Sequence, residues 1–83
     1  MSRRTRAVGA DGRSLGDVAE GARVRLVGID AGRGLGARLA AMGLVPGVEV
    51  LVVRNRGAGP AVVEVKGARL ALGRGMARRI LVR

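Results

Sequence analysis

Segments that contain glycine interrupt the second half of the chain at short intervals, and this spacing limits the folds that the chain can adopt. The stretches between them are a few residues long and rich in Val, Leu and Ile, a composition typical of β-strands. No long crossover connection follows residue 44, so a parallel sheet is not expected. The pattern predicts short strands joined by turns, with a two-residue turn at Lys66 and Gly67. The strands expected here are residues 48–54, 61–65, 68–72 and 79–82.

A further strand is expected at residues 22–29, where arginines alternate with apolar residues up to Leu26. The alternation shifts after this residue, so that Val27 and Ile29 are expected on the apolar side. Gly28 lies between them and indicates a β-bulge or a sharp bend, which a small barrel needs at its corners.

The N-terminal residues 1–13 have no hydrophobic periodicity and contain several arginines, so they are predicted to form a disordered basic arm. The expected folded domain is 14–83. Ser14 is expected to cap a single turn, with Asp17 completing a capping box. A second single turn, of the 3₁₀ type, is expected at 73–77.

The hydrophobic period changes after residue 34. Leu35, Leu39 and Met42 are four and three residues apart and form one stripe of a short helix. Gly43 is expected in the left-handed conformation just past this helix, with Leu44 folding back onto Leu39 as in a Schellman ending. Apolar stripes of this kind usually face a core, and we expect the inner half of this one to do so.

The short helix is bordered by arginine and followed by a rigid turn. Arg33 and Arg38 are expected on its exposed side, and Pro46 and Gly47 occupy the central positions of a type II turn. An amphipathic helix edged by arginine beside a rigid turn can serve as a docking surface. The candidate partner-binding residues are Arg33, Arg38, Leu39, Met42, Gly43, Leu44, Pro46 and Gly47.

Reactive residue types are scarce in this chain. It has no Cys, no His and no aromatic residue, so its core must be built from aliphatic side chains. Without Cys and His there are no thiolate or imidazole metal ligands and no His-based catalytic pairs. Asp17, Glu20 and Asp30 alone are a poor set for the selective capture of a transition metal. We therefore expect a binding module that is not an enzyme, with no cofactor and no metal site.

One motif suggests a different function. Gly32, Gly34 and Ala37 satisfy the dinucleotide-binding pattern G-x-G-x-x-A between an expected strand and an expected helix, and Glu49 lies near the place of an acidic ribose ligand. The hairpins that follow are incompatible with the parallel sheet such a site requires. In a chain with 15 glycines the pattern also has little specificity. A dinucleotide site is therefore not expected.

The chain is strongly basic: sixteen Lys and Arg residues against six Asp and Glu residues give a formal net charge of +10. A genome that favours arginine codons would explain this value without any function. An acidic partner would also explain it, as nucleic acid, an anionic membrane surface or an acidic protein. Proteins that bind single strands usually stack bases on aromatic side chains, which are absent here, so nucleic acid is the less favoured partner.

Residues 14–83 resemble the FeoA domain family in the order and spacing of their segments. The most specific part is the run from Met42 to Gly47, with the sequence M-G-L-V-P-G, whereas the flanking strands are generic. The resemblance implies an all-β fold, a small SH3-like barrel of about five short strands with one short helix after the first strand. The other matching segments are 15–18, 21–22, 35–39, 63–72 and 77–82.

The resemblance also implies a function. FeoA proteins are cytosolic accessories of FeoB, a membrane transporter for ferrous iron with a cytosolic GTPase domain. A cytoplasmic protein that binds this partner and modulates Fe(II) uptake is therefore expected. A basic β-barrel that binds nucleic acid is the alternative, and a domain of a metal-dependent repressor of the DtxR type is a third reading. The basic arm and the lack of aromatic residues depart from the family pattern. A homo-oligomer could form through an open barrel edge.

Overall fold

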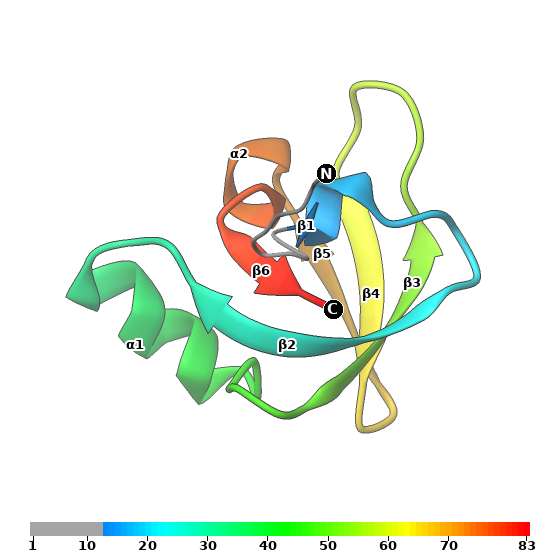
Figure 1. The fold of residues 1–83 in the computed structure, drawn as a ribbon. Coiled ribbons are helices and arrows are strands. Elements are labelled where there is room, and N and C mark those ends of the chain that lie inside the picture. The colour runs from blue at the N-terminus through cyan, green and yellow to red at the C-terminus, as the bar shows by residue number, and fades with distance from the viewer. Residues whose placement is uncertain (1–12) are drawn as a thin grey trace, which may run out of the picture.

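Six β-strands, one helix of nine residues and two single helical turns make up the described part of the chain (Figure 1). The computed structural model describes residues 13–83, so the expected arm lies outside the described residues except for Arg13. The elements are β1 (Arg13–Ser14), the 3₁₀ turn η1 (Leu15–Asp17), β2 (Arg23–Ile29), α1 (Arg33–Ala41), β3 (Glu49–Arg54), β4 (Ala61–Val65), β5 (Ala68–Leu72), α2 (Arg74–Ala77) and β6 (Ile80–Val82).

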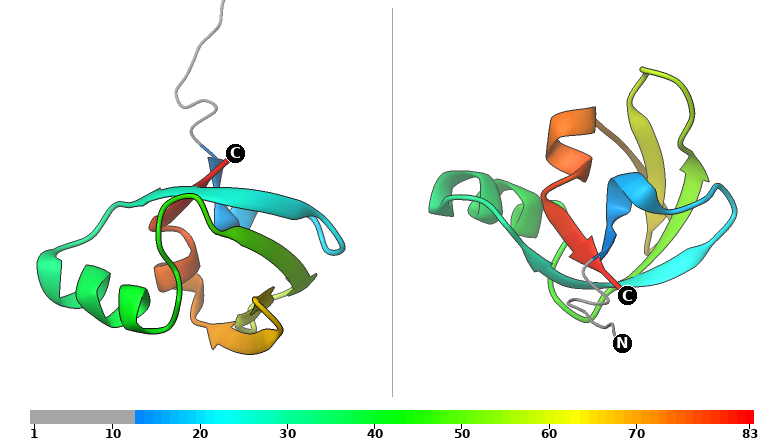
Figure 2. Two further views of the ribbon diagram at one scale, coloured as in Figure 1. Left: turned by 90° about the horizontal axis from the view of Figure 1, so that it is seen from below. Right: turned by 45° about the horizontal axis from the view of Figure 1, so that its top comes forward.

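The strands form one sheet in the order β1-β6-β2-β3-β4-β5, and each described pair is antiparallel. The sheet curls into a partly open barrel with β1 and β5 at its edges, while α1 lies outside it beyond the end of β2 (Figure 2). The predicted all-β class is confirmed, with the short β1 as a strand that the sequence analysis did not anticipate. The antiparallel order is incompatible with the crossover unit that the motif at Gly32 and Gly34 would need.

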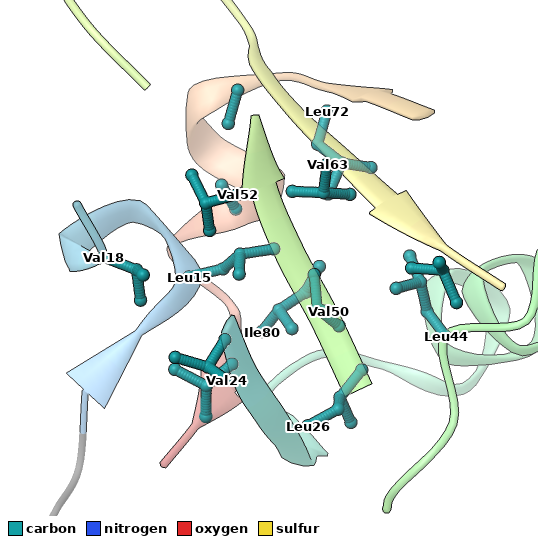
Figure 3. Close-up of a cluster of buried hydrophobic side chains, with 14 of the residues drawn as sticks. Leu15, Val18, Val24, Leu26, Leu44, Val50, Val52, Val63, Leu72 and Ile80 are labelled. Carbon is teal, nitrogen blue, oxygen red and sulfur yellow. The ribbon is translucent and has the colours of Figure 1, made fainter. Parts of the chain in front are cut away.

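An aliphatic core fills the barrel, as the absence of aromatic residues requires (Figure 3). Alternation along β2 buries Val24 and Leu26 and leaves Arg23 and Arg25 exposed. The same period places Val50 and other β-branched residues of the later strands inside. The largest fully buried side chains are Leu15, Val18, Leu26, Leu39, Leu44, Val50, Val52, Val63, Leu72, Ile80 and Val82.

The predicted irregularity in β2 is present. The register against β6 shifts between Leu26 and Gly28, so the strand contains a bulge. The expectation that Val27 faces the core is wrong, because its side chain is 48% exposed. The bulge inserts Val27 as an extra residue on the outer side, and Ile29 returns to a half-buried position.

The turn between β4 and β5 has the predicted two-residue form. Lys66 has a φ of 52° and Gly67 a φ of 83°. Positive φ at both central residues is the mark of a type I′ turn, whose twist matches that of the flanking strands. Val65 is paired with Ala68 across this turn, and the register continues to the pair Ala61 and Leu72.

The N-terminal turn also follows the sequence expectation. The backbone N–H and the hydroxyl of Ser14 both donate to a carboxylate oxygen of Asp17, at 3.3 Å and 3.2 Å. Arg13, expected in the arm, is paired with Val82 of β6, so the described fold includes one residue before the expected boundary. The expected 3₁₀ turn after β5 is instead a single turn of α-helix, α2.

Candidate interaction surface

The C-terminal end of α1 is a Schellman ending. Gly43 has a φ of 91°, and its N–H donates to the carbonyl of Ala40 at 3.0 Å. The N–H of Leu44 donates to the carbonyl of Leu39, also at 3.0 Å. These are the two hydrogen bonds that define the motif. Because Leu39 and Leu44 are 1% and 0% exposed, they anchor the end of the helix in the core.

The turn that follows α1 is bonded firmly to the barrel. Gly47 has a φ of 93°, and the N–H of Val48 donates to the carbonyl of Val45 at 3.1 Å, as in a type II turn. The N–H of Gly47 donates to the carbonyl of Leu26 in β2 at 2.7 Å. The guanidinium of Arg25 donates to the carbonyl of Gly47 at 2.8 Å. Backbone and side chain of β2 therefore hold the turn together.

The eight sequence-predicted contact residues separate into an inner and an outer group. Leu39 and Leu44 belong to the core, so they cannot contact a partner directly and instead support the helix end. Gly43 is half-buried. The exposed members are Arg33, Arg38, Met42, Pro46 and Gly47.

Exposed apolar side chains are concentrated around α1. The large hydrophobic residues that the described chain exposes are Val27 at 48%, Met42 at 43% and Val45 at 38%. Val27 lies in β2, which leads into α1, and the other two follow α1 directly. Val45 is exposed but was not among the contact residues predicted from the sequence. The M-G-L-V-P-G sequence indicates this exposure, because the Schellman ending turns Leu44 into the core and leaves Val45 exposed to solvent.

We define the α1 surface as the exposed side chains of Arg33, Arg38, Met42, Val45 and Pro46. Arg38 and Met42 are four residues apart and therefore lie on neighbouring turns. No acidic residue occurs in α1, and none of the ion pairs within residues 13–83 uses Arg33 or Arg38. The surface thus combines apolar contact area with positive charge that the described fold does not neutralise.

The helix that carries this surface has a weak intrinsic preference for helical structure. Gly34 and Gly36 lie inside α1, and each costs roughly 0.5–1 kcal/mol relative to Ala. A Cβ atom at either glycine would meet no other atom within 4 Å, so packing does not require them. The helix therefore depends on the anchored end at Leu39 and Leu44.

A cluster of polar side chains connects the β3–β4 loop to the N-terminal turn. The side-chain amide of Asn55 donates to the carbonyls of Gly16 at 3.0 Å and Val18 at 2.7 Å. Arg74 of α2 donates in turn to the side-chain oxygen of Asn55. Asn55 directly follows the strand expected at residues 48–54, and no local pattern predicts these long-range contacts. We infer no ligand here, since the cluster joins three elements of the fold.

Glu20 completes this cluster on its solvent side. Arg56 donates to both carboxylate oxygens of Glu20, at 2.9 Å and 2.8 Å, and the backbone N–H of Asn55 adds a bond of 2.8 Å. These donors favour the ionised carboxylate, with Arg56 as the largest cause, and lower the pKa of Glu20 to about 2. Glu20 is therefore an ionised structural partner of Arg56.

The carboxylates considered as metal ligands do not converge. Asp17 is bonded to Ser14 and Glu20 to Arg56. Within residues 13–83, no group of three or more acidic, His or Cys side chains is placed to hold a metal ion. A depression of about 260 Å³ on the outer face of β2, β3 and β4 carries charges of both signs. Its lining residues are Arg23, Glu49, Leu51, Glu64, Lys66 and Gly67.

No helix in the described part of the chain has the length and apolar character needed to cross a membrane.

Comparison with known sequences gives a consistent result. A family model described as the FeoA domain matches residues 13–83. A relative from Methanocaldococcus jannaschii, named as a candidate Fe(2+) transport protein A, is 43% identical over 63 residues. That match covers 76% of this chain and 76% of the relative.

Comparison with solved structures agrees with the sequence matches. An iron uptake regulatory protein, FeoA, matches with a TM-score of 0.79 and 34% identity, covering 84% of this chain and 93% of that one. FeoA from Stenotrophomonas maltophilia, solved with zinc, matches with a TM-score of 0.75 and 27% identity, covering 84% and 88%. It is described as a prokaryotic SH3 domain protein, so the expected SH3-like barrel is confirmed.

Proposed function

This chain belongs to the FeoA domain family, and on that premise we propose that it binds the cytosolic GTPase domain of a FeoB-type ferrous iron transporter and modulates Fe(II) uptake. It acts in the cytoplasm as an accessory protein, without catalysis of its own. The observation that supports the proposal most directly is the α1 surface, where apolar and cationic side chains are exposed together on a bonded support.

Rigidity makes the α1 surface suitable for binding. Two hydrogen bonds close the end of α1 at Gly43 and Leu44, and three more hold the turn at Gly47. A surface that is already ordered loses less conformational entropy when a partner docks. The backbone that carries these side chains is therefore ordered before the partner arrives.

The residue types of the α1 surface are also those that contribute to interfaces. Met and Arg are enriched in interface cores, whereas Lys and acidic residues are depleted. Met42 and Val45 supply apolar contact area, and Arg38 lies one helical turn from Met42. The partner that fits is an apolar patch bordered by carboxylates.

Binding alone is sufficient for regulation. An accessory protein shifts the equilibrium between two states of a transporter by as much as its affinities for the two states differ. A tenfold preference for one state corresponds to about 1.4 kcal/mol. No metal ligand and no catalytic group in the accessory protein is required for this effect.

The test is a binding titration of the transporter's cytosolic GTPase domain with the full-length chain. Arg38→Glu and Val45→Asp both change the α1 surface, and each is expected to weaken binding about tenfold. Arg78→Glu is the matched control, because it makes the same charge reversal at an exposed position outside this surface. Equal affinities for Arg38→Glu and Arg78→Glu would contradict the assignment of the surface.

The net charge of +10 supports a second candidate function, binding to nucleic acid. A salt titration with single-stranded and double-stranded probes distinguishes it. Contacts with phosphates would make the logarithm of the affinity fall steeply with the logarithm of the salt concentration. An affinity that does not fall with salt in this way would exclude nucleic acid as the partner.

A further inference from the structure

We propose that the outer edge of β5 is a second interaction surface, at which an extended acidic segment of another protein adds as an antiparallel strand. The surface is separate from the α1 surface, and its assignment does not depend on the identity of the transporter. Strand addition obtains affinity from main-chain hydrogen bonds and specificity from alternate side chains.

The register of the β4–β5 hairpin shows which backbone groups of β5 are free. In a two-residue type I′ hairpin, the residues flanking the turn form a hydrogen-bonded pair, here Val65 and Ala68. Hydrogen-bonded and non-hydrogen-bonded pairs then alternate along an antiparallel ladder. The N–H and C=O groups of Arg69 and Ala71 consequently point away from β4. They form two donors and two acceptors in the spacing that an added strand requires.

This edge is open in the described fold. Among residues 13–83, β5 is the last strand of the sheet and β4 is its sole strand neighbour. Within residues 13–83, no hydrogen bond to another element uses the backbone of Arg69 or Ala71. Both residues are exposed, as is Ala68. Since edge strands with free backbone groups are templates for pairing, the composition of the edge decides what can pair there.

The charges along the edge favour an acidic segment. Arg69 and Lys66 are exposed, whereas Arg74, directly after β5, donates to the side chain of Asn55. Glu64 lies opposite Arg69 on β4, but no ion pair within 4.0 Å joins the two side chains. A second copy of this chain, with its own net charge of +10, would bring like charges together. Arg69 and Lys66 therefore disfavour pairing with a second copy of this chain and favour binding of a segment with carboxylates.

The two faces of β5 also define the order of side chains in the partner. Leu70 is half-buried and lies on the inner face, whereas Arg69 and Ala71 lie on the outer face. A strand added antiparallel would place an apolar residue beside Leu70 and an acidic residue beside Arg69. The residue beside Ala71 is small or polar. The recognised pattern, written from the N-terminus of the partner, is polar, apolar, acidic, apolar.

The experiment uses the full chain and a capped peptide of sequence Thr-Val-Glu-Val-Thr, with Thr-Val-Lys-Val-Thr as the matched control. Amide hydrogen exchange is measured residue by residue by NMR. At a peptide concentration ten times Kd, the exchange of Arg69 and Ala71 is expected to slow about tenfold, because these amides are protected only in the complex. The amides of Ala68 and Leu70, already directed at β4, are expected to be protected before the peptide is added. The lysine peptide should protect neither pair.

Two variants complete the test. Ala71→Pro removes an outward N–H without removing a bond to β4, so it should abolish protection by the acidic peptide. Arg69→Glu keeps the backbone intact. This variant should no longer bind the glutamate peptide and should bind the lysine peptide instead. The proposal is overturned if the acidic peptide does not protect Arg69 and Ala71, or if both peptides protect them equally. It is also overturned if concentrated protein without peptide shows the same protection, because a second copy of the chain would then occupy the edge.

Discussion

Replacing Gly43 by Ala tests the description of the end of α1. Gly43 has a φ of 91°, and a Cβ added there would lie 3.9 Å from the Val65 side chain, an ordinary contact. Crowding therefore contributes little, and the cost is that of a left-handed backbone in an L-residue, about 1–2 kcal/mol. For a domain of this size, that loss lowers Tm by roughly 4–16 °C.

The measurement is a thermal and urea unfolding comparison of the parent with three variants. Gly43→Val is expected to be at least as destabilised as Gly43→Ala, since its side chain is branched at Cβ. A D-alanine at position 43, introduced by chemical synthesis, favours positive φ and should be as stable as glycine or more so. If L-Ala leaves the stability unchanged, or if L-Ala and D-Ala are equally destabilising, the argument from φ is refuted.

Three further predictions concern stability. Gly36→Ala should raise the free energy of unfolding by roughly 0.5–1 kcal/mol, because the added methyl group meets no neighbour; a lower Tm would contradict this. Asn55→Ala should cost about 1–3 kcal/mol in urea unfolding, since two carbonyls lose their donor; an unchanged midpoint would refute the role of the cluster. Glu20→Gln should be less stable than the parent at neutral pH. The pKa of Glu20 is lowered from 4.5 to about 2 on folding, so the parent's advantage is present above pH 4.5 and declines as the pH falls towards 2. A difference that does not change with pH would exclude this linkage.

The features that the sequence predicted correctly depend on the backbone of a few neighbouring residues. The Schellman ending at Gly43, the type II turn at Gly47 and the type I′ turn at Gly67 all require positive φ, which glycine accepts most readily. The alternation in β2 likewise depends on the period of a strand. These signals are local, so they can be recognised without knowledge of the partners.

The errors concern residues whose environment depends on distant parts of the chain. Val27 faces outward because the pairing of β2 with β6 inserts a bulge there. Asn55 bonds to carbonyls 39 and 37 residues earlier, at Gly16 and Val18, and no local pattern marks such a contact. Leu44 is different: the motif that folds it back onto Leu39 also implies its burial, so its place among the contact residues could have been rejected from the sequence.

The sequence by itself determined where this chain turns, which faces of its strands are apolar and that its core is aliphatic. Those properties follow from backbone preferences and from hydrophobic periodicity, which act over a few residues. Only the tertiary structure decided which side chains of the α1 surface reach solvent and that β5 has a free edge. Exposure and strand pairing depend on segments far apart in the chain, and their positions are set by the closing of the barrel around its core.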